Sequence, residues 1–166
     1  FAGGSSTVPS QIYSYRMQLN GKMKLNQTVV APAGNVFLGE YVHPTQNVLY
    51  AALPPTNQVA VYTYAGATGL LTLQTQVPTT GALPCWLTMN ATGTRLYTGN
   101  TMDNTIDVFD TTIATAPVFL QHVAVKQTTA GSGVTSLKFD PTGQFFYALS
   151  NSPTSSSLHV FNVNAD

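Results

Sequence analysis

The chain has 166 residues, enough for one domain with a proper hydrophobic core. Only 7% of the residues are Asp, Glu, Lys or Arg, against about 25% in an average soluble protein. Six basic residues balance six acidic ones, so no net field attracts the protein to nucleic acid or to an anionic membrane surface. No stretch approaches the roughly 20 apolar residues that span a bilayer. Nucleic-acid binding and membrane insertion are therefore not expected.

Short segments rich in β-branched and aromatic residues, separated by turn signals, predict strands along the whole chain. They recur in one order: an apolar strand, a turn followed by a strand with a tyrosine, a strand ending in an aromatic residue, and a last strand. The repeats occupy 1–33, 34–80, 81–127 and 128–166. The expected strand segments, in chain order, are Phe1, 12–13, 23–28, 36–42, 43–50, 59–62, 70–75, 84–89, 90–97, 106–109, 118–123, 134–139, 140–147 and 158–161.

The repeat is defined best by Tyr50, Tyr97 and Tyr147, which are 47 and 50 residues apart. Four short strands in a repeat of this length are typical of a β-propeller blade. The strands of a blade are lettered A to D, with A innermost and D outermost. The chain then supplies strands B–D of the first blade, two whole blades, and strands A–C of the fourth. The predicted fold is all-β: a partial propeller of about three and a half blades.

A propeller closes with about four to eight blades, and each blade buries its faces against its neighbours. We therefore expect a second polypeptide to complete the ring, either a C-terminal half or another copy of the chain. The last blade ends without strand D. Proteolytic cleavage in an exposed loop and a sequence that continues further explain this equally well.

Two N-x-Ser/Thr acceptor sequences start at Asn26 and Asn90, both at expected turns. Together with the low charge they favour a secreted, extracellular glycoprotein, although no signal peptide is present in the chain. The single cysteine, Cys85, is either a buried thiol or half of a bridge to another chain. Its place in a strand favours the buried thiol.

The segment 84–100, followed by 104–109, resembles the seven-bladed lactonase family, as do 43–50 and 140–147. That family includes bacterial 6-phosphogluconolactonases and fungal 3-carboxy-cis,cis-muconate lactonising enzymes. The resemblance implies a seven-bladed propeller of which this chain is the N-terminal half. In catalytic members a Pro-His pair at the start of an inner strand helps to build the site. Here the pair reads Pro84-Cys85, its equivalents are Leu38 and Thr135, and the Cys-Trp version resembles a secreted branch of the family.

Four inner-strand residues are the candidate ligand contacts: Glu40, Cys85, Trp86 and Thr135. Glu40 is the only glutamate; we expect it either to face the channel as a ligand contact or to be merely solvated. Cys85 has no base near it in sequence, so a nucleophilic role is not expected. Trp86 either stacks on a ligand or packs between blades, and packing is the favoured interpretation.

The remaining polar residues suggest no cofactor and no metal. His43 is interpreted as a turn-former, and His122 and His159 fall in different strands without ligand-like spacing. The aspartates at 103, 107 and 110 lack the pattern of a calcium loop and are interpreted as turn and edge residues. The recurrent tyrosines are expected to fill the spaces between blades, namely Tyr13, Tyr50, Tyr62, Tyr97 and Tyr147.

The favoured functional hypothesis is a non-catalytic propeller that binds a small molecule, a glycan or a protein at the channel mouth, as a carrier or an adhesin. The alternative is an enzyme, either a lactonase or a cyclase that forms lactones from muconate-type acids. Such anionic substrates need arginines, and the chain offers only Arg16 and Arg95. A structural role is the third hypothesis.

Overall fold

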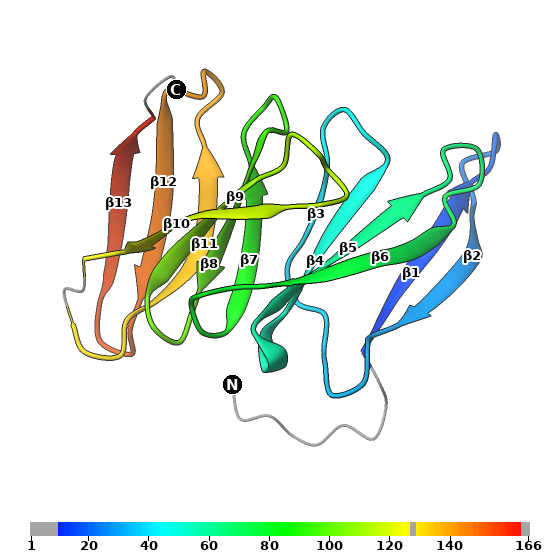
Figure 1. Ribbon diagram of the computed structural model, residues 1–166. Helices are drawn as coiled ribbons and strands as arrows, with labels where there is room; N and C mark the ends of the chain where they lie inside the picture. The colour runs from blue at the N-terminus through cyan, green and yellow to red at the C-terminus, as the bar shows by residue number, and fades with distance from the viewer. Residues whose placement is uncertain (1–9, 127–128, 164–166) are drawn as a thin grey trace.

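The computed structural model describes residues 10–126 and 129–163, and it is built almost entirely of antiparallel strands. The sheets follow one another in chain order from the N-terminal to the C-terminal side of the molecule (Figure 1). The elements are β1 (Gln11–Met17), β2 (Met23–Val30), β3 (Glu40–Val42), β4 (Val48–Leu53), the 3-10 turn η1 (Pro54–Thr56), β5 (Gln58–Tyr64), β6 (Leu71–Pro78), β7 (Pro84–Met89), β8 (Arg95–Asn100), β9 (Thr105–Asp110), β10 (Val118–Ala124), β11 (Gly133–Phe139), β12 (Phe145–Asn151) and β13 (Ser156–Asn162).

The four sheets reproduce the predicted repeat. The first contains β1 and β2, the second β3–β6, the third β7–β10 and the fourth β11–β13. In each sheet neighbouring strands are consecutive in the chain, so every connection is a hairpin or a short loop. The prediction of an all-β partial propeller is confirmed. The strand expected at Phe1 lies outside the described residues.

The first strands of the sheets lie side by side, since β7 contacts both β3 and β11. These three are the inner strands of the propeller. β7 covers the predicted 84–89, and β11 covers the predicted 134–139 with one more residue. The prediction of a strand over 36–42 is only partly right, because the regular strand β3 begins at Glu40.

The hydrophobic core lies between adjacent sheets rather than at one centre. The space between the second and third sheets contains Tyr50, Leu87, Met89 and Phe109. A second cluster joins the third and fourth sheets, and a third joins the second sheet to Ile12 and Val29 of the first. The second and third sheets therefore carry apolar side chains on both faces, as the packing of blade against blade requires.

The expectation that the five recurrent tyrosines fill these spaces is confirmed for three of them; Tyr147 is half-buried but belongs to none of the three clusters, and Tyr13 is exposed. Tyr50 and Tyr62 are buried, and Tyr97 packs against Phe139 and Phe146. Half of the Tyr13 side chain is exposed. The expected slot is also off by two residues, because the bulges of the β1–β2 and β5–β6 pairs align Tyr15, not Tyr13, with Tyr62. Ile12 packs toward the second sheet, so the neighbouring Tyr13 points to the opposite face of the first sheet, against which no described sheet lies.

Candidate site at the inner strands

The predicted site residues Cys85 and Thr135 occupy the same irregularity in two inner strands. Pro84 pairs with Asn100 and Trp86 with Gly99, so Cys85 is the extra residue of a bulge. The pairing of β11 shifts in the same way around Thr135. In the second sheet, Leu38 and Gly39 both bond to Ala52, which makes Leu38 the third equivalent. Bulges re-aim side chains and are frequent beside functional sites.

Cys85 is a buried free thiol, as the sequence favoured. Burial raises the pKa of the thiol, and a hydrogen bond with the Thr101 hydroxyl opposes part of that rise. The same hydroxyl donates to the carbonyl of Val134 at 2.8 Å. Cys85 therefore links β7 to the fourth sheet, and a thiol with a raised pKa is a poor nucleophile at neutral pH.

Trp86 is the aromatic candidate, and its side chain is open to a ligand. Its exposed fraction is 41%, although it lies in the middle of an inner strand whose neighbours are mostly buried. It takes part in none of the clusters of buried residues between the sheets, and both interpretations, stacking on a ligand and packing between blades, stay predictions. Its equivalents in the repeat are Gly39 and Ser136, and Ser136 is also exposed.

Glu40 does not share this orientation. It pairs with Ala51, and Val42 pairs with Leu49; both partners belong to the cluster that faces the first sheet. The intervening Tyr41 packs on the opposite face, against the third sheet. The carboxylate is exposed, and the structure directs it toward the first sheet rather than into the channel.

Thr135 completes the set of candidates. Its hydroxyl lies 3.4 Å from the carbonyl of Leu149, and the side chain is partly buried. Thr135 and Cys85 lie on either side of the contact between Thr101 and Val134. The structure thus brings Cys85, Trp86 and Thr135 together on adjacent strands and separates Glu40 from them.

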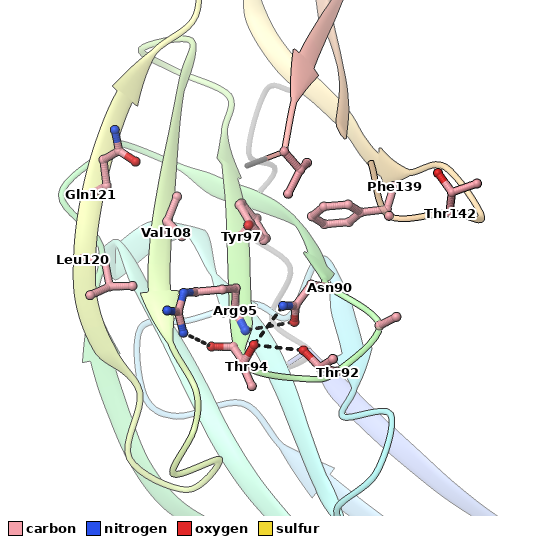
Figure 2. Close-up of a pocket in the computed structure, with 13 residues that line it drawn as sticks. Asn90, Thr92, Thr94, Arg95, Tyr97, Val108, Leu120, Gln121, Phe139 and Thr142 are labelled. Atoms are coloured by element: carbon pink, nitrogen blue, oxygen red, sulfur yellow. Dashed lines mark hydrogen bonds between the residues drawn. The ribbon is translucent and has the colours of Figure 1, made fainter. Parts of the chain in front are cut away.

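A large cleft opens elsewhere, between the third and fourth sheets, with a volume of about 780 Å³. Figure 2 shows Arg95, Tyr97 and Val108 on one wall and Phe139 with Thr142 on the other. The guanidinium of Arg95 is already occupied by Asp110, at 3.3 Å, and by the carbonyl of Thr94.

The repeat explains this cleft without a ligand. Between the second and third sheets the equivalent space is filled by the loop after β9, where Ala114 is buried and accepts a bond of 2.7 Å from the Tyr50 hydroxyl. Burial also raises the pKa of that phenol, so it remains a donor. The loop after β9 begins with a hydrogen bond from the N–H of Thr111 to the carbonyl of Thr94. In the fourth sheet, Val163 after β13 makes the equivalent bond, from its N–H to the carbonyl of Gln144. The volume of the cleft therefore does not mark a ligand site.

The sequence misjudged Asp107, which was interpreted as a turn or edge residue. Asp107 is fully buried and accepts bonds from the backbone of Thr80 and Gly81 and from His122. It holds the third sheet to the loop that enters it. His43 is a turn residue as predicted, and its Nε2 also contacts the carbonyl of Gly93 at 3.0 Å. Within residues 10–126 and 129–163, no group of three or more His, Cys, Asp or Glu side chains is arranged to hold a metal.

The two acceptor asparagines differ in their contacts. The Asn26 amide nitrogen donates to the carbonyl of Thr68 at 2.7 Å and to the hydroxyl of Ser14 at 3.3 Å. The Asn90 amide nitrogen donates to the hydroxyl of Thr94 at 2.9 Å. An N-linked glycan replaces one amide hydrogen, so it is compatible with the bond at Asn90 but removes one of the two at Asn26. Glycosylation and an extracellular location stay predictions.

Comparison with known proteins follows this geometry. The family described as "Lactonase, 7-bladed beta-propeller" matches residues 5–119. The chain belongs to the seven-bladed lactonase family. No curated protein matches the chain. In the described part of the chain, no helix is long and apolar enough to cross a membrane.

Solved structures agree with the family assignment at the level of the fold. A protein from Lactobacillus plantarum superposes with a TM-score of 0.80 at 21% identity over 93% of this chain and 48% of its own. A Bacteroides uniformis protein named for 6-phosphogluconolactonase gives 0.80 at 13% identity, with the same coverage. The periplasmic gluconolactonase of Pseudomonas aeruginosa gives 0.80 at 20% identity, over 96% of this chain and 48% of its own. The chain thus spans about half the length of these structures.

Proposed function

We propose that the propeller containing this lactonase-family chain binds an aldonolactone at the channel end of its inner strands and hydrolyses it. The observation that carries the proposal is the exposed indole of Trp86 beside the bulge at Cys85. The family match and two neighbours named for gluconolactonase chemistry support the substrate class. An exposed aromatic face suits a ring-shaped ligand.

Hydrolysis adds water to the lactone carbonyl, breaks the ring C–O bond and releases the open-chain hydroxy acid. The reaction needs a base for the water and donors for the oxyanion. In the described chain, the inner strands β3, β7 and β11 carry no histidine or arginine. Under this proposal Trp86 positions the lactone, and the acid–base groups come from inner strands beyond the described residues.

A second candidate is binding without turnover, as a carrier or an adhesin. Cys85 favours it, because this residue stands where catalytic relatives have histidine, and the raised pKa of the buried thiol excludes it as a base. The two candidates share one binding surface and differ only in chemistry.

One experiment separates the two candidates, because Trp86 is the single tryptophan of the chain. Glucono-δ-lactone and gluconate are titrated against the complete propeller while indole fluorescence and acid release at constant pH are recorded. Variants with any further tryptophans changed to Phe assign the fluorescence signal to Trp86. Saturable quenching together with acid release above the spontaneous rate supports the lactonase. Saturable quenching without additional acid release supports binding without turnover.

The variant Trp86→Ala tests the role of the indole. Losing one ring contact is expected to weaken lactone binding or turnover by about tenfold, from roughly 1.4 kcal/mol of lost interaction. Phe119→Ala is the matched control, because Phe119 has a similar exposed fraction, 43%, on β10, the outermost strand of the same sheet. If no lactone quenches the fluorescence, or if both variants behave alike, the proposed function is wrong.

A further inference from the structure

Glu40 stands at a position where the sister sheets place a buried leucine. The shared bulge fixes the alignment, which makes Leu87 and Leu137 its equivalents. Leu87 is 9% exposed and Leu137 is 6% exposed, and each packs toward the preceding sheet. The repeat therefore offers Glu40 an apolar, covered environment, whereas its side chain ends in a carboxylate.

The surface around Glu40 is apolar and uncovered in the described chain. Val42, on the same face, is 52% exposed, although its equivalent Met89 is buried. Leu38 and Val36, just before the strand, are also exposed. This face points toward the first sheet, of which β1 and β2 are the outer strands. In a closed propeller an inner strand of the first blade covers it, as β3 covers β7.

Covering an isolated carboxylate with apolar surface costs several kcal/mol unless a partner compensates it. The nearest described residues provide none: Glu40 has no recorded hydrogen bond or ion pair within 10–126 and 129–163. Its strand neighbours on the same face are Ala51, Leu49 and Val42, which are all apolar. A compensating group on the strand that covers this face would remove this cost.

We propose that the face carrying Glu40 docks the inner strand of the first blade, and that this strand brings an arginine or a lysine into contact with the Glu40 carboxylate. The pair lies inside an apolar interface and fixes which strand closes the ring, since a strand without the cation leaves the charge uncompensated. The inference concerns closure of the propeller and holds whether or not a lactone is hydrolysed.

The test is Glu40→Leu in the complete propeller, because leucine is the residue that the repeat places here. If a cation faces Glu40, the substitution leaves that cation buried alone, and the thermal midpoint falls by about 5 °C or more. If no cation is present, the new leucine packs against the covering strand as Leu87 and Leu137 pack in their sheets, and the thermal midpoint stays the same or rises. Circular dichroism reports both the midpoint and the correct fold.

Removal of the partner completes the test. Each basic residue of the covering strand is changed to Met, alone and together with Glu40→Leu. The cation is identified as the residue whose loss is destabilising alone but restores the midpoint in the double variant. A midpoint unchanged or raised by Glu40→Leu overturns the proposal, and so does a fall that no basic-to-Met change reverses.

Discussion

At the scale of single residues, Asp107 shows how one buried carboxylate holds two segments to a sheet. Its Oδ2 accepts the backbone N–H of Thr80 at 2.7 Å and that of Gly81 at 3.0 Å. Its Oδ1 lies 2.6 Å from Nδ1 of His122, on the outer strand β10. The acceptor sites of the carboxylate are thus matched to donors, which is the condition under which a buried acidic group is tolerated.

Asp107→Asn is expected to lower the free energy of unfolding by about 2 kcal/mol, because bonds to a charged acceptor are lost and the new amide group faces donors. Urea denaturation measures the change. Asp110→Asn is the control: Asp110 lies in the same strand, but its carboxylate is partly exposed and bonds mainly to Thr112. Equal stability of the two variants would contradict the role assigned to Asp107.

At the scale of the elements, the inner strands approach so closely that one position requires glycine. A Cβ atom on Gly39 would collide with the carbonyl oxygen of Cys85 and would lie 3.2 Å from the Cα of Trp86. Gly39 therefore lets the start of β3 lie against β7, directly beside the exposed indole.

Gly39→Ala is expected to destabilise the chain by about 1–3 kcal/mol, the usual cost of overpacking, and to shift the fluorescence of Trp86. Gly66→Ala is the control, since a Cβ there meets only the side chain of Asn47, which can move. Thermal melts and emission spectra measure both variants. A neutral Gly39→Ala would mean that the two strands are not packed as closely as described.

These elements also show how far the sequence alone reached. The repeat predicted β7 to the residue because three copies fixed its register independently. The direction of Glu40 was not predictable, because a bulge at Leu38 shifts the alternation by one residue and turns every later side chain to the other face. Asp107 was misjudged because its donors come from a loop 26 and 27 residues earlier in the chain, which no local pattern reveals.

At the scale of the whole molecule, the two ends of the described chain present surfaces that blades normally bury. At the first sheet Tyr13 and Tyr15 are exposed; at the fourth sheet Leu158 and Val160 are. β13 is also an edge strand, in a place where the second and third sheets have β6 and β10 as further strands. Unpaired edges and contiguous apolar faces favour association.

The 166-residue chain, expressed by itself, is therefore expected to associate rather than remain a monomer of 17.6 kDa. Native mass spectrometry measures this directly, because an assembly of several copies appears at a multiple of the chain mass. Val160→Lys should weaken the association, because a charge on an exposed edge strand opposes pairing. Thr154→Lys, in the exposed turn before β13, adds the same charge away from the strand and should leave the association intact. A monomer that persists at micromolar concentration would contradict the expectation that these faces need a partner.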